Sequence, residues 1–334
     1  MKDNTTPTIS SRRNFLKSLG AAGASLTLPI HSALAGLADL KKPIKLGLIA
    51  DLHHDVMHDG PQRLDAFLKA MKATKPDGLI QMGDFAIPKD QNKKIIETFN
   101  NAHPVSLHVI GNHDTDHGYS KQQCQKAWGM PGFYYTQLVE GVRLIVLDGN
   151  DKGSPTHKGG YASYIGKPQT EWLAKTLKET SEPTIIISHQ PLAGPGAIDN
   201  AKEVQEILKQ HVDKILISIC GHMHIDDHID IDGIPYVNIN SASYVWVGGK
   251  YKNQSYSEEI HKKYKWIDHT APYKDSLFTT LTIDPKTKTI SLEGMETTWV
   301  GKSPKELGQE FKNDGIEVGK HVVPKISARK IALT

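Results

Sequence analysis

The sequence reads Ile44-Lys-Leu-Gly-Leu-Ile-Ala50 and then Asp51-Leu-His53, so a short apolar run stops at a charged residue. A run of this length is typical of a buried strand. Two similar runs follow, at 78–82 and 105–110, and each is followed by glycine and polar residues. Apolar residues at helical spacing lie in the stretches between them. This alternation predicts an α/β protein in which helices connect the strands of a sheet.

The same kinds of pattern continue along the chain. Further strands are predicted over 133–140, 142–148, 184–188, 215–220, 225–231 and 235–239, a hairpin over 277–293, and helices over 64–71, 90–101, 168–179 and 204–208. No long linker or repeat interrupts this pattern, which predicts one domain over residues 36–300. The Lys-rich tail, residues 301–334, is weakly patterned, and we expect it to wrap the surface or to fray.

The composition excludes several classes of protein. Of 334 residues, 38% are hydrophobic and 23% are charged, as in a globular chain. The two cysteines, Cys124 and Cys220, are too few for a disulfide framework or a cysteine-based zinc cluster. The first 35 residues hold four basic side chains and one acidic side chain, so the rest of the chain carries 36 of each sign. This balance does not support electrostatic binding of nucleic acid.

The N-terminus has the layout of an export signal. Ser11-Arg-Arg-Asn-Phe-Leu-Lys17 precedes a weakly apolar stretch, and Ala33-Leu-Ala35 forms a small-x-small cleavage motif. The paired arginines resemble the twin-arginine signal of bacterial export, although a disordered tail or a membrane anchor is the alternative. We predict a signal peptide over 1–35, the twin-arginine translocase as export partner, and a periplasmic or secreted mature protein without a stable membrane span.

Five clusters of polar residues follow predicted strands. They are Asp51-Leu-His53, Gly83-Asp84, Gly111-Asn-His-Asp114, His189 and Gly221-His-Met-His224. Functional groups of open α/β sheets gather at the carboxyl ends of the strands, so these clusters are expected to meet. Residues two apart on an extended segment point the same way. This predicts that Asp51 and His53 reach one side, and likewise His222 and His224. The glycines are expected to allow sharp turns and to leave room for ions.

These residue types favour a particular chemistry. Carboxylates together with neutral imidazoles suit Mn, Fe, Zn or Co rather than calcium. Two aspartates, one asparagine and four histidines are too many for one tetrahedral ion and suit two ions that share a carboxylate. Such a pair of ions clamps a phosphoryl group and lowers the pKa of a bridging water. A single cluster is compatible with an ordinary turn, but five in this order predict a metal centre.

The series of motifs resembles the calcineurin-like metallophosphoesterase family. The resemblance implies a four-layer α/β/β/α sandwich, with two mixed β-sheets flanked by helices and the metal site at the carboxyl ends of strands. It implies seven ligands to two divalent metal ions: Asp51, His53 and His224 on the first ion, Asn112, His189 and His222 on the second, and Asp84 bridging both.

The resemblance also implies an activity. A hydroxide that bridges the two ions would attack the phosphorus of a small phosphate mono- or diester. His113 would serve as proton donor or charge stabiliser near the leaving oxygen, held in place by Asp114. The alternative is a non-catalytic protein of the same fold that binds metal or a partner. A metallo-β-lactamase-type hydrolase would need a His-x-His-x-Asp-His block, and none occurs.

Departures from the family's branches narrow the prediction. Ile87 stands where purple acid phosphatases have an iron-binding tyrosine, which argues against a ferric site. The Gly-Asp-x-x-Asp-Arg motif of the protein phosphatases is missing, which disfavours a phosphoprotein substrate. Too few residues follow the last hairpin for a nucleotidase's second domain. Monoester or diester preference, metal identity and oligomeric state do not follow from these motifs.

Two further stretches leave alternatives open. His54, Asp55, His58 and Asp59 crowd the loop after the first pair, and they either orient ligands, contact substrate or form a solvated loop. Six aromatic residues lie in an aperiodic segment over 241–269: Tyr244, Trp246, Tyr251, Tyr256, Tyr264 and Trp266. They are expected either to stack a base or an aryl leaving group, or simply to pack a long loop.

Overall fold

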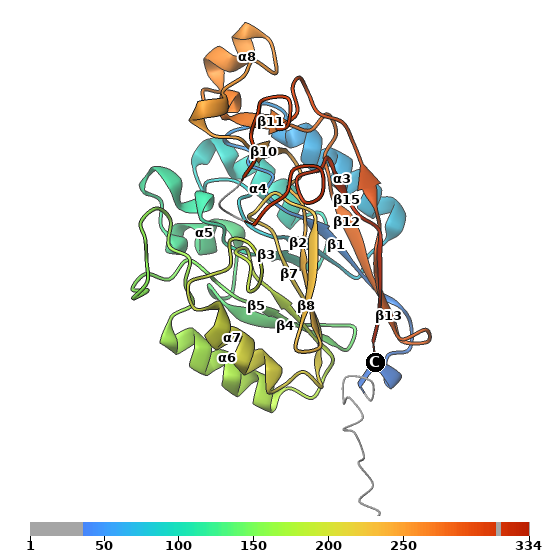
Figure 1. The fold of residues 1–334 in the computed structure, drawn as a ribbon. Helices are drawn as coiled ribbons and strands as arrows, with labels where there is room; N and C mark the ends of the chain where they lie inside the picture. Colours follow the sequence, from blue (N-terminus) through green and yellow to red (C-terminus); the bar gives the residue numbers. More distant parts are fainter. Residues whose placement is uncertain (1–35, 312–314, 334) are drawn as a thin grey trace, which may run out of the picture. The chain divides into compact units, whose positions relative to one another are not determined.

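The computed structural model describes residues 36–311 and 315–333, so the predicted signal peptide lies outside the described residues. All elements below belong to the unit that begins at residue 31. Two six-stranded sheets form the centre of this unit, and helices lie against them (Figure 1). None of the helices in the described residues has the length and apolar character that crossing a membrane requires.

The first sheet has the strand order β16-β13-β12-β1-β2-β3. Its members are β1 (Ile44–Ile49), β2 (Gly78–Gln81), β3 (Ser106–His108), β12 (Thr279–Asp284), β13 (Thr289–Leu292) and β16 (Arg329–Ala332). Strands β1, β2 and β3 are parallel, whereas β12, β13 and β16 pair antiparallel with their neighbours. The three parallel strands therefore deliver their carboxyl ends to one edge.

The second sheet has the order β4-β5-β6-β7-β9-β8. Its members are β4 (Tyr135–Val139), β5 (Val142–Val146), β6 (Thr184–Ile187), β7 (Ile215–Cys220), β8 (Asp227–Ile231) and β9 (Ile234–Asn238). The four central strands are parallel, and β4 and β8 are antiparallel strands at the two edges. Both sheets are thus mixed.

Helices cover the faces of the sheets that point away from the shared core. They are α3 (Gly60–Thr74), α4 (Lys93–Asn100), α5 (Lys121–Trp128), α6 (Lys167–Glu179) and α7 (Ala201–Lys209). In β5, Leu144 and Val146 join the core that both sheets share, whereas Ile145 packs with α6 and α7. In β1, Gly47 lies directly under α3, where any side chain would collide with Met71. The predicted α/β/β/α sandwich is confirmed.

The remaining elements are short. They are η1 (Asp90–Asn92), η2 (His113–Gly118), β10 (Tyr244–Trp246), η3 (Gly249–Tyr251), α8 (Glu258–Lys263), η4 (Ile267–His269), β11 (Thr270–Pro272), β14 (Met295–Glu296) and β15 (Lys325–Ile326). Most of these short elements were not expected from the sequence. Strands β10 and β11 pair with each other and carry the aromatic segment.

Part of the C-terminal tail joins the fold. Strand β16 pairs with β13 and forms the edge of the first sheet, and β15 pairs with β14. The sequence did not indicate these strands, because alternation over two to four residues is too short to recognise without the partner strand. The division into a signal peptide (1–35), a domain (36–300) and a tail (301–334) stays a prediction.

Candidate metal centre

The five polar clusters all follow strands that run parallel in their sheets. Strands β1, β2 and β3 lead into the first three clusters, and β6 and β7 lead into His189 and His222. The loop after β1 is tied to the loop after β2, since the N–H of Asp51 donates to the carbonyl of Gly83 and that of His53 donates to the carbonyl of Asp84. The clusters therefore converge as the sequence predicted.

The backbone of these loops is strained. Five non-glycine residues have left-handed conformations: Asp51 (φ 53°), His53 (47°), Asp84 (50°), His222 (72°) and His224 (52°). Such conformations cost roughly 1–3 kcal/mol each, and they concentrate at functional sites. The expectation that these pairs lie on extended segments is wrong. Left-handed turns, rather than extended backbone, carry both members of the Asp51–His53 pair into one group with His224.

Glycine is required where one loop touches another. A side chain at Gly111 would collide with the backbone and carboxylate of Asp84, and one at Gly221 would come 2.6 Å from the Asp51 carboxylate. At Gly83, where φ is 97°, it would meet the His189 ring. These glycines therefore make room for neighbouring side chains rather than directly for ions.

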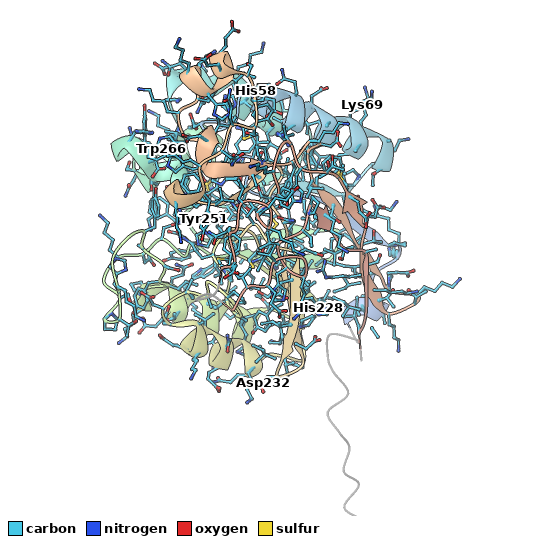
Figure 2. The ribbon with its side chains drawn as sticks, turned by 45° about the horizontal axis from the view of Figure 1, so that its top comes forward. His58, Lys69, His228, Asp232, Tyr251 and Trp266 are labelled. Atoms are coloured by element: carbon cyan, nitrogen blue, oxygen red, sulfur yellow. The ribbon has the colours of Figure 1, made fainter. Side chains whose placement is uncertain are left out.

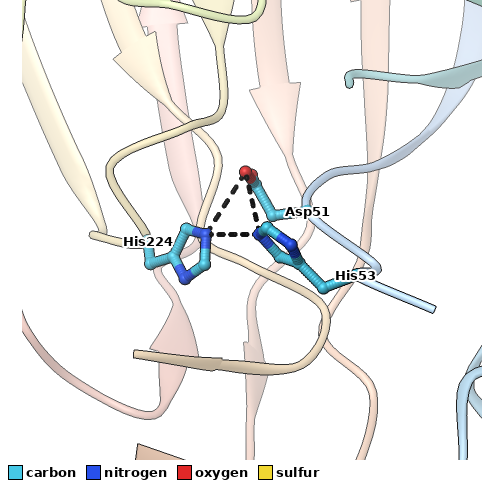
Figure 3. Close-up of side chains that lie close together, drawn as sticks. All are labelled: Asp51, His53 and His224. Carbon is cyan, nitrogen blue, oxygen red and sulfur yellow. Dashed lines mark hydrogen bonds and ion pairs between the residues drawn. The ribbon is translucent and has the colours of Figure 1, made fainter. Parts of the chain in front are cut away.

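Asp51, His53 and His224 form the first group that could hold a metal ion (Figure 3). The Nε2 atoms of the two histidines lie 3.0 Å apart. The Oδ1 atom of Asp51 is 3.3 Å from Nε2 of His224 and 4.0 Å from Nε2 of His53. All three side chains are buried, so three potential ligand atoms face one another out of contact with bulk water.

Asp84, His189 and His222 form the second group. Nε2 of His189 lies 3.2 Å from Oδ2 of Asp84 and 3.2 Å from Nδ1 of His222. Oδ1 of Asn112 is also 3.2 Å from Nε2 of His189, so the predicted amide ligand belongs to this group. The structure thus brings together all seven residues predicted as ligands.

Asp84 links the two groups through a single atom. Its Oδ2 atom faces His189 of the second group at 3.2 Å and His53 of the first group at 3.6 Å. Its Oδ1 atom accepts a hydrogen bond from the backbone N–H of His113 at 2.8 Å, which fixes the carboxylate. This is the position that a bridging carboxylate requires.

Backbone carbonyls set the tautomer of two histidines. Nδ1 of His189 donates to the carbonyl of Met82 at 2.8 Å, and Nδ1 of His224 donates to the carbonyl of Tyr244 at 2.7 Å. With Nδ1 engaged in this way, Nε2 of each ring is the nitrogen directed into the site. Orientation of metal-binding imidazoles by such outer contacts is usual in proteins.

The electrostatics favour cations. Burial lowers the pKa of His53 well below its ordinary value and lowers that of His222 to about 3, so both rings are neutral. Burial alone would raise the pKa of Asp84, but the facing His189 and His113 outweigh it and hold that pKa well below its usual range. His189 differs: although burial opposes it, Asp84 and Asp51 raise the pKa of His189 to about 10, so a metal ion at this ring would take the place of a proton. With that exchange, the residues offer the neutral imidazoles and ionised carboxylates that suit two divalent ions.

His113 stands beside the two groups without belonging to either. Its ring centroid lies 5.3 Å from that of His53, and its Nδ1 atom is 2.8 Å from Oδ2 of Asp116. The hydroxyl of Tyr161 donates to Oδ1 of Asp116 at 2.7 Å and lies 3.1 Å from Nδ1 of His113. Burial opposes it, but Asp84 and Asp116 raise the pKa of His113 above its ordinary value.

The expectation that Asp114 holds His113 is wrong. The Asp114 carboxylate instead accepts hydrogen bonds of 2.8–3.0 Å from the backbone N–H groups of Asp84, Phe85, Ala86 and Gly111. It therefore ties the loop after β2 to the loop after β3. The turn that follows places Asp116 against the His113 ring, a contact that adjacency in sequence does not reveal.

A family model for calcineurin-like phosphoesterases matches residues 44–226, more than half of the chain and every residue of the two groups. The chain belongs to the calcineurin-like phosphoesterase family. A second model, for the twin-arginine translocation signal sequence, matches residues 10–29. Both resemblances predicted from the sequence are confirmed.

One curated relative and two solved structures are similar to this member of the family. A cAMP/cGMP dual specificity phosphodiesterase of Mycobacterium tuberculosis is 26% identical over 200 residues, which are 55% of this chain and 60% of the relative. The chain thus spans about three fifths of that relative's length.

Two solved structures share the fold. One is a dimetal phosphatase from Danio rerio (TM-score 0.54, 15% identity), which covers 77% of this chain and 98% of its own. The other is GAP50, the anchor in the inner membrane complex of Plasmodium (TM-score 0.53, 13% identity), which covers 88% and 90%. At these identities the likeness concerns the calcineurin-like fold alone.

A cavity of about 490 Å³ opens beside the two groups of this member of the family. The residues that line it include His53, Asp84 and His113 of the centre, together with Tyr161, Trp246 and Trp266. Asp116 and Tyr161 were not found from the sequence. Asp116 lies two residues beyond a recognised motif, whereas Tyr161 follows Gly159-Gly160 in a loop that gave no signal.

The polar loop after β1 is mainly structural. Asp55 accepts from the N–H of Ile87 at 2.8 Å and pairs with Lys89. The ring of His58 packs against Tyr256 with centroids 4.4 Å apart, in the part of the molecule where Figure 2 labels His58 and Trp266. Of the four polar residues of this loop, His54, Asp55, His58 and Asp59, Asp55 is the one that also lines the cavity.

Proposed function

We propose that this chain is an exported, dinuclear metal-dependent phosphoesterase that hydrolyses small phosphate mono- or diesters. The observation that carries the proposal is the Oδ2 atom of Asp84, which faces both groups beneath an open cavity. The activity named for the Mycobacterium tuberculosis relative supports a diester among the substrates. The twin-arginine signal supports export, with the periplasm or the exterior as the destination.

Each residue of the centre has a role in this proposal. Asp51, His53 and His224 would hold one divalent ion, Asn112, His189 and His222 the other, and Asp84 both. Two such ions, when bound, supply Lewis acidity toward the phosphoryl oxygens and lower the pKa of bound water. Mn, Fe, Zn and Co are all compatible with these ligands.

The proposed proton donor is His113. Asp116 engages its Nδ1 atom, so Nε2 is the ring nitrogen that can face a substrate in the cavity. Although burial opposes it, Asp84 and Asp116 raise the pKa of His113, which favours the protonated ring that would pass a proton from Nε2 to the leaving oxygen. Asp116 and the Tyr161 hydroxyl hold the ring in this orientation and stabilise its charge.

Hydrolysis of model esters tests the proposal. The purified protein is assayed with p-nitrophenyl phosphate and bis(p-nitrophenyl) phosphate, with added Mn²⁺, Zn²⁺, Co²⁺ or Fe²⁺ and after chelation. We expect release of p-nitrophenol that chelation abolishes and a metal restores, and roughly two ions per chain by metal analysis. A folded protein that hydrolyses neither ester with any of these metals would contradict the proposed activity.

Export is tested separately. Replacing both Arg12 and Arg13 by Lys is expected to leave the precursor in the cytoplasm, because the paired arginines are the recognised feature of the signal. Fractionation of cells that express each form measures the distribution. Undiminished delivery of the double variant across the membrane would remove the twin-arginine assignment.

A further inference from the structure

Two tryptophans of the 241–269 segment are exposed, although most of that segment packs. Tyr244 is buried with Met57 and Ile267, and Tyr256 and Tyr264 pack against them. Trp246 is 43% exposed and Trp266 is 55% exposed, and both line the cavity beside the metal centre. We refer to this pair as the aromatic wall. Exposed indoles are costly to leave in water, so their position in a cavity points to a ligand.

The Trp246 indole stacks on a neighbouring ring, and the two indoles of the wall are tilted against each other. The ring of His269 stacks on the Trp246 indole, with an interplanar angle of 10° and centroids 5.2 Å apart. Nδ1 of His269 lies 2.6 Å from Oδ1 of Asp268, which holds the imidazole in place. The Trp266 indole meets Trp246 at 41°, with centroids 6.3 Å apart. The His269 ring therefore covers one face of Trp246, although 43% of this residue stays exposed beside Trp266.

A row of rings connects the wall to the centre. The Tyr244 ring lies 4.9 Å from His53 and 6.5 Å from Trp246, measured between centroids. Tyr244 thus lies next to a residue of the first ligand group on one side and next to Trp246 on the other. The sugar of a nucleotide separates its phosphate and its base in the same manner.

The charges of the cavity disfavour a cationic ligand. A quaternary ammonium group is bound where several ring faces surround one point, often beside a free carboxylate. Here Asp55 is paired with Lys89, and Asp116 is engaged by His113 and Tyr161. The Trp246 indole, with His269 against one face, offers one flat surface rather than several rings around a point. A flat aromatic surface suits a planar ring as its ligand.

Building on the proposed phosphoesterase function, we propose that Trp246 and Trp266 bind the nucleobase of the substrate, so that the preferred substrates are nucleotide esters. The base stacks on the wall while the phosphoryl group lies at the ligand groups. Stacking is tolerant of the identity of the base, because every base has a π face, so purine and pyrimidine nucleotides are both accepted.

Kinetics with matched substrates test this inference. kcat and KM are measured for adenosine and cytidine nucleotides, glycerol phosphate and glycerophosphocholine, with wild type, Trp246→Ala, Trp246→Phe, Trp266→Ala and Leu138→Ala. We expect Trp246→Ala to lower kcat/KM for the nucleotides by roughly 5- to 150-fold, mainly through KM, because that is the range for loss of one stacked base. Activity on glycerol phosphate should stay within about twofold, and Phe should restore most of the loss.

A binding measurement separates this inference from the catalytic proposal. Adenosine, which has no phosphate, is titrated into the chelated protein while tryptophan fluorescence is recorded. Quenching is expected in wild type and in Leu138→Ala, whose leucine is 45% exposed outside the cavity, and it should be lost in Trp246→Ala. Quenching without hydrolysis of any ester would support the wall and contradict the phosphoesterase.

Other outcomes overturn the aromatic wall as a base-binding site. Equal loss on glycerol phosphate and on nucleotides would show that Trp246 only supports the structure. A selective loss on glycerophosphocholine would assign the wall to a quaternary ammonium group instead. Hydrolysis of all esters with unchanged kinetics in the tryptophan variants and no quenching would leave the phosphoesterase function standing without the base-binding wall.

Discussion

The metal centre and the aromatic wall share one cavity but differ in almost every physical respect. The predicted ligand residues of the centre are mostly buried, and five of the seven have left-handed backbone. Trp246 and Trp266 are exposed and come from a segment with little periodicity. Chemistry on a phosphate requires preorganised ligands, and these can be recognised as motifs in the sequence. Selectivity for the organic part of a substrate resides in exposed loop residues, which form almost no recognisable motif.

The largest expected effect is at the centre. Replacing Asp84 by Asn should lower metal content at both positions and nearly abolish hydrolysis, since an amide cannot supply the shared, charged oxygen that faces His53 and His189. Metal analysis and the bis(p-nitrophenyl) phosphate assay measure the two effects. The control is Asp230→Asn, an aspartate with 67% of its side chain exposed on β8. An unchanged content of two ions in the Asp84 variant would refute the bridge.

The second-largest effect is expected at His113, which lines the cavity beside the two ligand groups. His113→Ala should lower kcat by roughly 10²- to 10⁴-fold while metal content stays near wild type, because the imidazole moves a proton without being a ligand. The loss should shrink for p-nitrophenyl esters, whose leaving group needs little protonation, and be largest for alkyl esters. Loss of one ion in this variant would instead make His113 a ligand, and an equal loss on all esters would indicate charge stabilisation.

Asp116 and Asp114, two residues apart, should respond in different ways. Asp116→Asn should lower kcat by about 10- to 100-fold, the range for partners that orient a functional imidazole, with little change in Tm. Asp114→Asn should lower the free energy of unfolding by roughly 1–3 kcal/mol, because an amide cannot accept all four backbone N–H groups.

Kinetics and thermal unfolding of both variants, measured in parallel, separate the two roles. If Asp114→Asn loses activity at unchanged Tm while Asp116→Asn is silent, the sequence-based pairing of His113 with Asp114 is correct after all.

The smallest effect concerns a buried histidine outside the centre. Nδ1 of His108 accepts from Gln81 at 3.0 Å and its Nε2 donates to Asn100 at 2.6 Å, and burial lowers the pKa of His108 to about 3. Below about pH 6.5 this histidine therefore binds a proton in the unfolded chain but not in the folded chain. Its contribution to the free energy of unfolding is complete above that pH and falls below it by about 1.4 kcal/mol per pH unit.

Urea unfolding at pH 7.5 and pH 5.0 measures this slope. His108→Gln should unfold more easily at pH 7.5 but show a shallower loss of stability on acidification than wild type. The same slope in both proteins would mean that His108 is protonated in the folded state. His108 differs in this respect from the histidines of the ligand groups, because both of its ring nitrogens have hydrogen-bond partners outside those groups.

The sequence alone was sufficient to predict that the seven candidate ligands come together and which strands carry them. Asp51, Asp84, Asn112, His189 and His222 each follow an apolar run, and both features are local, so they can be recognised without knowing which strands pair. The same local logic failed where a pattern was too short, as in β16, whose place at the edge of the first sheet depends on β13, nearly forty residues earlier.

Only the tertiary structure decided the contacts between loops. It placed Asp116 rather than Asp114 against His113, and it buried Tyr244 while leaving Trp246 exposed two residues later. These outcomes depend on left-handed turns and on segments that meet from distant parts of the chain, and neither leaves a periodic signal. Strand patterns follow from the local preference of apolar residues for burial, whereas the orientation of a loop side chain follows from the sum of its non-local contacts.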